Sequence, residues 1–297
     1  MTDALQRYLD PKVVERIGSL ELQARRIVEG LISGRHRSPF FGQSVEFAQH
    51  REYVPGDDLR HIDWKVWAKS DRFYIKQFEE ETNLRATLLL DSSESMAYGE
   101  GETNKFEYAS GLAASLSFLM LRQSDSVGMV VFDEQVATAV PHHTTQIHLR
   151  QLLHAMTMSQ NVRKTEMEKV LRQIADREQK RGLIILISDL LADRNSVLRG
   201  LRMLRRRKHD LIVLHVMHED EIEFKFEGPT QFLGLESMPN LTCDPKALRD
   251  EYLASLNRYL QQIRKLCSQE DIQYRFVPTN KPMDAVLASL LVERSQR

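Results

Sequence analysis

The stretch ATLLLDSSES, residues 86–95, decides the fold of this 297-residue chain. Its first five residues form a short apolar segment, as expected of a strand that is covered on both faces of a sheet. A stronger strand of the same kind, residues 183–187, lies further along the chain in LIILISDLLAD. An aspartate directly follows each strand, Asp91 the first and Asp189 the second. Because open α/β sheets bind ligands at the carboxyl ends of their strands, we expect both aspartates at the functional edge.

From residue 85 onward, segments with strand character alternate with segments of helical periodicity. Further strands are predicted at residues 126–132, 211–217 and 272–277, with an edge strand at residues 135–140. Helices are predicted at residues 105–121, 147–156, 165–179, 195–207, 245–267 and 284–292. This alternation indicates right-handed β-α-β crossovers, and it predicts an α/β fold whose mostly parallel sheet has helices on both faces.

The first 84 residues have a different character. Residues 11–34 predict one or two helices, and short strands are predicted at residues 45–47 and 73–78. Trp64 and Trp67, three residues apart, suit one face of a short helix that packs on the second domain. We therefore predict an N-terminal α+β module over residues 1–84 and an α/β domain over residues 85–297.

The composition is that of a cytoplasmic globular protein. Lys and Arg number 41 against 42 Asp and Glu, so no net charge favours nucleic acid as a partner. The two cysteines fit a reducing compartment, and neither a secretory signal nor a membrane-spanning stretch is found in the sequence. A basic run at residues 202–208 is typical of a solvated helix end, with an acidic docking partner as the alternative.

The spacing of Asp91, Ser93 and Ser95 predicts a metal site. Side chains two residues apart on a tight loop let one carboxylate and two hydroxyls face a common point, near Asp189. Hard oxygen ligands of this kind suit Mg²⁺, and Mn²⁺ accepts the same set. The alternative is that these side chains cap the helix that follows, which is common for Asp and Ser.

This Asp-x-Ser-x-Ser pattern after a strand resembles the metal-ion-dependent adhesion site of von Willebrand factor A domains. The resemblance implies that a threonine from another loop and an aspartate after a later strand complete the metal shell. Asp189 matches that aspartate by position. For the threonine the first choice is Thr165, although basic residues precede it where the family has glycines; Thr144 and Thr145 are alternatives. In that family an acidic residue of the partner fills the open metal position, which implies an acidic protein ligand.

Residues 42–95 are similar to the bacterial family called domain of unknown function fifty-eight. That family resembles von Willebrand A proteins encoded beside MoxR-type AAA+ ATPases. It therefore implies an ATPase partner, in assembly or maturation of other proteins. The matching residues are Arg51-Glu52-Tyr53, Pro55-Gly56-Asp57-Asp58, Arg60, Ile62-Asp63-Trp64 and Glu81.

The motif PGDDLRHIDW in the N-terminal module has two interpretations. Its carboxylates lie beside arginines, which more often form a structural ion network than a functional site. The alternative is a loop that docks a partner. The residues concerned are Asp57, Asp58, Arg60, Asp63 and Trp64.

No catalytic arrangement is recognisable. The chain has neither glycine-rich phosphate-binding pattern nor the G-x-S-x-G of serine hydrolases, and its histidines lack zinc-site spacing. We therefore predict a metal-dependent protein-binding module rather than an enzyme. The alternatives are a metal-dependent hydrolase of phosphoesterase type and a scaffold with a vestigial site.

Overall fold

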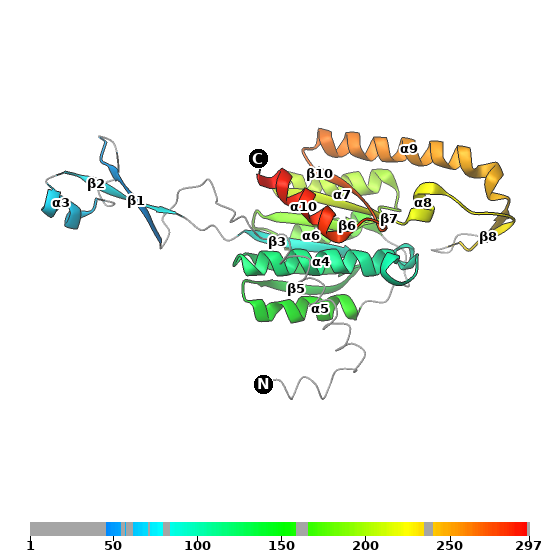
Figure 1. Ribbon diagram of the computed structural model, residues 1–297, viewed down its shortest axis with the longest axis horizontal. Coiled ribbons are helices and arrows are strands. Elements are labelled where there is room, and N and C mark those ends of the chain that lie inside the picture. Colours follow the sequence, from blue (N-terminus) through cyan, green and yellow to red (C-terminus); the bar gives the residue numbers. More distant parts are fainter. Residues whose placement is uncertain are drawn as a thin grey trace, which may run out of the picture. The chain divides into compact units, whose positions relative to one another are not determined.

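The computed structural model describes most of the chain as two compact units, which are treated separately below (Figure 1). The described residues of the smaller unit end at Glu79, and those of the larger unit begin at Leu84. The structure describes residues 46–54, 57, 62–70, 72–79, 84–158, 166–234 and 240–295. The helices predicted at residues 11–34 lie outside these ranges.

The smaller unit contains an antiparallel strand pair and one helix. β1 (Glu46–Glu52) pairs with β2 (Tyr74–Glu79), and α3 (Trp64–Ser70) lies between them in sequence. Ile62 forms a bridge to Ile75 of β2, and these two apolar side chains are both buried. Ile62 and Ile75 are the buried apolar residues among those side chains of this unit whose burial the structure describes.

The larger unit is built on a six-stranded sheet in the order β5-β4-β3-β6-β7-β10. Only the edge strand β5 is antiparallel to its neighbour. From β3 the chain adds β4 and β5 on one side of the sheet and then β6, β7 and β10 on the other, so the strand order reverses between β3 and β6. The predicted α/β fold with a mostly parallel sheet is confirmed. The strands are β3 (Arg85–Asp91), β4 (Ser126–Phe132), β5 (Val136–His143), β6 (Leu183–Ser188), β7 (Asp210–Met217) and β10 (Gln273–Pro278).

Helices cover both faces of this sheet, and each face has its own apolar core. One core includes side chains from α4 (Lys105–Arg122), α5 (Leu149–Thr157) and α10 (Met283–Ser295). The other includes side chains from α6 (Met167–Arg177), α7 (Arg194–Arg206) and α9 (Pro245–Gln269). Each predicted helix of the larger unit is present, with ends shifted by a few residues at most.

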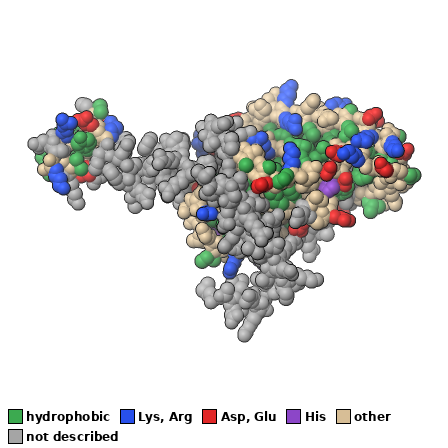
Figure 2. All heavy atoms as spheres, in the orientation of Figure 1, with side chains coloured by type: hydrophobic (Ala, Val, Ile, Leu, Met, Phe, Trp, Pro, Cys, Tyr) green, Lys and Arg blue, Asp and Glu red, His purple; other side chains and the backbone are tan. Residues whose placement is uncertain are grey.

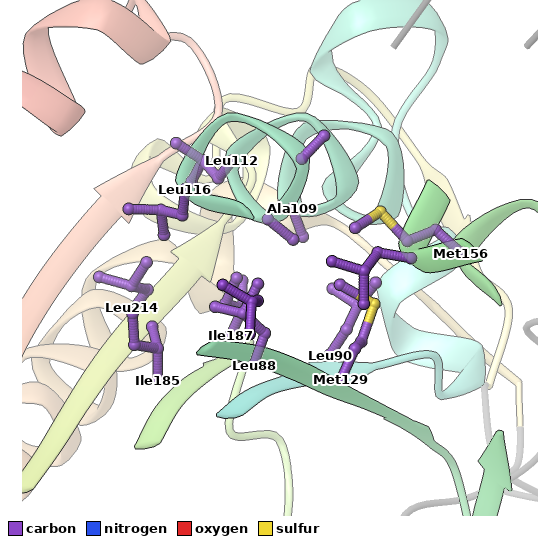
Figure 3. Packing of buried hydrophobic residues seen from close by; sticks show 14 of the residues in the cluster. Leu88, Leu90, Ala109, Leu112, Leu116, Met129, Met156, Ile185, Ile187 and Leu214 are labelled. Atoms are coloured by element: carbon purple, nitrogen blue, oxygen red, sulfur yellow. The ribbon is translucent and has the colours of Figure 1, made fainter. Parts of the chain in front are cut away.

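Helix α4 lies at the centre of the first core. Figure 3 shows Ala109, Leu112 and Leu116 above the side chains of the central strands, among them Leu88 and Ile187. The three serines of this helix are also buried. The hydroxyls of Ser115 and Ser117 donate to carbonyls one turn back, those of Gly111 and Ala113, whereas the Ser110 hydroxyl has no hydrogen-bond partner within the described residues. The hydroxyls of Ser115 and Ser117 are therefore satisfied inside the helix, which is buried on nearly all sides.

Several short elements were not predicted. Three 3₁₀ turns precede helices, and a one-turn helix follows β7, near a small hairpin. None of the helices in the described ranges is both long and apolar enough to cross a membrane. The short elements are η2 (Glu94–Ala97), η3 (Gly101–Thr103), η4 (Gln146–His148), α8 (Glu219–Glu223), β8 (Thr230–Phe232) and β9 (Leu241–Cys243).

Candidate metal centre

Strands β3 and β6 bring two aspartates to the same edge of the sheet. Leu90 pairs with Ile187, so Asp91 at the end of β3 lies beside Ser188 at the end of β6. The Ser188 hydroxyl donates to Oδ2 of Asp91 at 2.6 Å, and Asp189 follows directly. Both aspartates are buried. The meeting point is the place where the strand order reverses, which is where open α/β sheets bind ligands.

The loop after β3 adds two hydroxyls. The backbone N–H of Ser93 donates to Oδ1 of Asp91 at 2.9 Å, and the hydroxyls of Ser93 and Ser95 are 3.1 Å apart. Ser93 is the N-cap residue of η2, yet its side chain makes no capping hydrogen bond. The following long helix is capped by Asn104 instead. Helix capping therefore does not explain the two serine side chains.

The electrostatics of this point favour a cation. Burial, together with the charge of Asp189, raises the pKa of Asp91 to about 7, although hydrogen bonds from Ser188 and Ser93 act in the opposite direction. A buried carboxylate beside a second one is relieved by a positive charge. One carboxylate and two hydroxyls are also the hard oxygen donors that Mg²⁺ and Mn²⁺ accept. Asp91, Ser93 and Ser95 therefore fit a divalent ion.

Asp189 is in a different situation because it already has a cationic partner. Its Oδ2 accepts from the Lys105 ammonium at 2.7 Å, and its Oδ1 accepts from the backbone N–H of Leu191 at 3.1 Å. Lys105 also donates to Oε1 of Glu221 at 2.7 Å. Burial disfavours the ammonium, but the two carboxylates outweigh it, so the pKa of Lys105 lies above its usual value.

Neither Lys105 nor Glu221 was predicted as a site residue. The available signal was a lysine that opens an otherwise apolar helix directly after its N-cap, where a cation faces the unfavourable end of the helix dipole. Glu221 gave no comparable signal, since it lies in an acidic stretch that reads as solvated surface. Only the fold brings it within reach of a residue 116 positions earlier.

Comparison with known proteins places the chain in a family. The family model described as protein of unknown function DUF58 matches residues 49–261. The chain belongs to the DUF58 family. Uncharacterized proteins of Mycobacterium tuberculosis and Mycobacterium bovis are 28% identical to it over 249 residues, which make up 82% of this chain and 77% of theirs. The membership predicted from the sequence is confirmed.

Two solved structures are similar to this DUF58 chain at low identity. An aerotolerance-related membrane protein from Bacteroides fragilis is 16% identical, with a TM-score of 0.49. The protein BatB from Bacteroides thetaiotaomicron is 14% identical, with a TM-score of 0.44. Each similarity covers 72% of the DUF58 chain and 100% of the other chain.

The fold narrows the choice of threonine that is expected to complete the metal shell of the DUF58 protein. Thr165, the first choice, lies outside the described residues. Thr144 and Thr145 follow the end of β5, which runs antiparallel to β4, so His143 pairs with Val127 near the start of β4. Both threonines therefore lie at the edge opposite Asp91, and the prediction of either as an alternative ligand was wrong.

In the smaller unit of the DUF58 chain, carboxylates of the PGDDLRHIDW motif form hydrogen bonds that stabilise the local structure. Arg51 pairs with Oδ1 of Asp57 at 2.7 Å, and Oδ2 of Asp57 accepts from the backbone N–H of Val54 at 2.9 Å. The backbone bond and then Arg51 lower the pKa of Asp57. Oδ1 of Asp63 accepts from Val66 N–H at the start of α3. These bonds support the structural interpretation; Asp58 and Arg60 lie outside the described residues.

Four aromatic side chains form a surface on this unit. Trp67 stacks on Phe73 with ring centroids 5.9 Å apart, while Trp64 and Tyr53 make edge contacts to Trp67 and Phe73 respectively. Trp64 is 58% exposed and Trp67 38%. Figure 2 shows hydrophobic side chains among charged ones on the smaller unit. We call Tyr53, Trp64, Trp67 and Phe73 the aromatic surface.

In the described ranges, no group of three or more His, Cys, Asp or Glu is placed to hold a metal, either at the candidate centre or elsewhere. The candidate centre therefore depends on its serines. The basic run on α7 borders a hollow of about 460 Å³. Arg202 and Arg205 pair there with Glu270 and Asp271, both at 2.7 Å. This compensation supports a solvated helix end rather than an anion site.

Proposed function

We propose that this DUF58 protein is a metal-dependent protein-binding module rather than an enzyme. The observation that carries the proposal is the cluster of Asp91, Ser93 and Ser95 at the point where the strand order reverses. Mg²⁺ or Mn²⁺ is the ion that these oxygens suit. When bound, a divalent ion supplies a Lewis-acidic position that an acidic side chain of a partner completes. The chain's own residues hold that position in a rigid, buried frame.

The hydrogen bonds of the two aspartates support binding over hydrolysis. Asp91 is held by Ser188 and Ser93, and Asp189 is held by Lys105 and Leu191. Carboxylates fixed on both oxygens suit static ligation better than proton transfer to or from a water. The nearby His215 is also committed, because its Nδ1 contacts the Tyr274 hydroxyl at 2.7 Å and burial lowers its pKa to about 4.

The partner in this proposal is a MoxR-type AAA+ ATPase, in the cytoplasm, with assembly or maturation of other proteins as the outcome. Support comes from the family, which resembles proteins encoded beside such ATPases. An acidic side chain on the ATPase or on a client protein would approach the metal edge. The aromatic surface of the smaller unit is a second surface to which the ATPase could dock.

The first test is calorimetric titration of Mg²⁺ and Mn²⁺ into the wild type and into Asp91→Ala. A matched control is Asp176→Ala, which removes an exposed aspartate paired with Arg207. The expected result is saturable binding that Asp91→Ala loses and Asp176→Ala retains. Wild-type protein that binds neither ion at millimolar concentration would contradict the metal half of the proposal.

The second test is capture of the ATPase with and without chelator. We expect a complex that chelator dissolves and that Asp91→Ala fails to form. A complex that survives chelator would instead direct attention to the aromatic surface. Turnover of a generic phosphoester that disappears in Asp91→Ala would favour the hydrolase alternative.

A further inference from the structure

The turn that follows β6 contains a residue with a strained backbone. Leu190, directly after Asp189, has a φ of 53°, in the left-handed region that a leucine rarely adopts. This conformation is unfavourable for any residue with a Cβ, because that atom approaches the following carbonyl oxygen. The Leu190 side chain has 0% exposure and lies in the core that α6, α7 and α9 form with the sheet. The strain is therefore located at the carboxyl edge of the sheet, beside the candidate metal centre.

The position of Leu190 in the fold distinguishes it from other residues of this conformation. In the described residues, the other non-glycine residues with a positive φ each lie at the carboxyl end of a helix, where a left-handed residue ends helices routinely. Leu190 follows a strand instead, so no helix end explains it. Strain of this kind is concentrated at functional sites. The residues at helix ends are Ser124, Lys208, Phe224 and Asp271.

The strained turn supplies hydrogen bonds that orient both aspartates. The backbone N–H of Leu190 donates to the Ser188 hydroxyl at 2.9 Å, and that hydroxyl donates to Oδ2 of Asp91 at 2.6 Å. The next backbone N–H, that of Leu191, donates to Oδ1 of Asp189 at 3.1 Å. Two successive backbone groups therefore orient carboxylates that belong to the ends of neighbouring strands.

A tyrosine of α9 holds this turn in place. The Tyr259 hydroxyl donates to the Leu190 carbonyl at 2.6 Å, and the backbone N–H of Ala192 donates to the same oxygen at 2.7 Å. The Leu190 carbonyl and the Leu191 N–H belong to one planar peptide group, so a bond that fixes the first also fixes the second. The Tyr259 hydroxyl therefore acts on Asp189 through the backbone of the turn.

We propose that Leu190 and Tyr259 are positioning residues of the candidate metal centre. The left-handed turn, held by the tyrosine hydroxyl, orients Asp189 directly and Asp91 through Ser188, so that both carboxylates are fixed for an ion. The inference rests on the proposed metal-binding function. It extends the site to α9, a helix that supplies none of the expected ligands.

The first test compares two tyrosines that make the same kind of hydrogen bond. Tyr259→Phe removes the hydroxyl that holds the turn. Tyr108→Phe is the matched control, because the buried Tyr108 hydroxyl donates to the Lys281 carbonyl at 2.7 Å on the other face of the sheet. The affinity of the full chain for Mn²⁺ is measured by calorimetry, and urea unfolding gives the stability of each variant.

We expect Tyr259→Phe to bind Mn²⁺ about tenfold more weakly than the wild type, as is usual when a group that orients metal ligands is lost. Tyr108→Phe should bind within about twofold of the wild type, because separate sites act independently. If the Tyr259 hydroxyl had only a structural role, both variants would lose stability to a similar extent and neither would change its affinity for Mn²⁺.

A second pair of variants tests the conformation of the turn without any metal. Leu190→Gly and Leu190→Ala both remove the buried side chain, but only glycine adopts a positive φ freely. At a position with an ordinary φ, alanine gives the more stable protein because it restricts the unfolded chain. In chelator we expect the reverse order, with Leu190→Gly unfolding at higher urea than Leu190→Ala.

This pair also decides the metal test if Tyr259→Phe proves unfolded by circular dichroism. The glycine variant keeps the turn, so it should bind Mn²⁺ more tightly than the alanine variant. If neither variant of Leu190 folds, the comparison of Tyr259→Phe with Tyr108→Phe decides.

The outcomes separate this inference from the proposed function. Wild-type binding that Tyr259→Phe weakens and Tyr108→Phe retains supports both. Wild-type binding that Tyr259→Phe leaves unchanged, or that both variants weaken equally, overturns the inference alone. Greater stability of Leu190→Ala than of Leu190→Gly also overturns the inference alone. Absence of Mn²⁺ binding in the wild type overturns both.

Discussion

At the scale of single residues, the carboxylate of Asp91 is predicted to oppose folding when no cation is present. Asp91→Asn keeps the side-chain shape but removes a buried charge that lies beside Asp189. In chelator at pH 8 we expect this variant to be more stable than the wild type by about 1–3 kcal/mol. Urea unfolding measures the difference. A variant less stable than the wild type would show that the buried charge is compensated without an ion.

His142 is predicted to make the protein sensitive to acid. Burial lowers its pKa to about 4, with Glu178 acting in the opposite direction and Arg85 and His148 in the same one. Its Nε2 contacts the Thr87 hydroxyl at 3.0 Å. Because the folded state disfavours the proton, the unfolded chain binds more protons between pH 6.5 and about 4. Stability therefore falls as pH falls through this window, by up to about 3 kcal/mol.

The variant His142→Gln isolates this effect, since its amide can still contact Thr87 but does not titrate. Urea unfolding at several pH values between 7 and 4 should give a shallower loss of stability than in the wild type. His215, the other histidine with a strongly lowered pKa in the described residues, is retained in both proteins. Equal slopes would show that the acid response originates elsewhere.

At the candidate site, the sequence predicted the residues that lie next to strand ends but did not predict Lys105 and Glu221, which lie elsewhere in the chain. Asp91 and Asp189 were predictable because a strand end fixes which edge of the sheet the next residue occupies. The pairing of Asp189 with Lys105 was not, because it joins residues 84 positions apart that are adjacent only in the folded chain. Thr144 lies at the sheet edge opposite Asp91 because β5 runs antiparallel to β4, and the periodicity of an edge strand does not specify its direction.

At the scale of elements, the contact between β4 and β5 depends on the absence of a side chain at Gly128. A Cβ placed there would lie 2.7 to 2.9 Å from three ring atoms of His142, which crosses β4 to reach Thr87. We therefore expect Gly128→Ala to cost about 1–3 kcal/mol of stability, measured by urea unfolding.

The double variant Gly128→Ala with His142→Ala is the control for this clash. Once the ring is gone, the added methyl group should cost little, so the two single effects should not add. Additive effects would show instead that the alanine disturbs the strand itself.

The elements of the larger unit were predictable nearly to the residue. Buried strands and amphipathic helices carry strong periodic signals, and capping residues such as Asn104 and Asp193 mark where helices begin. The short elements after β7 were missed, because α8 and the β8–β9 hairpin span only three to five residues each. Segments this short contain too few periods for a pattern to appear.

At the scale of the whole molecule, the two units are predicted to unfold separately. Both tryptophans of the chain, Trp64 and Trp67, belong to the smaller unit, so tryptophan fluorescence reports on that unit alone. Far-UV circular dichroism reports mainly on the helices of the larger unit. The smaller unit is much the shorter of the two, and a short unit buries less surface and exposes less on unfolding, so the fluorescence transition should occur at lower urea and with a smaller slope. Coincident transitions would indicate one cooperative structure.

The reversal of strand order at β3 has a consequence for synthesis on the ribosome. The nascent chain completes β3, β4 and β5 before β6 has been made, so one side of β3 emerges as an open, apolar edge. That edge closes only when β6 has been translated and pairs with it. Asp91 and Asp189 come from opposite sides of this seam. The candidate metal centre is therefore incomplete in a nascent chain that has not yet reached β6, and a partner that recognises it would not bind such a chain.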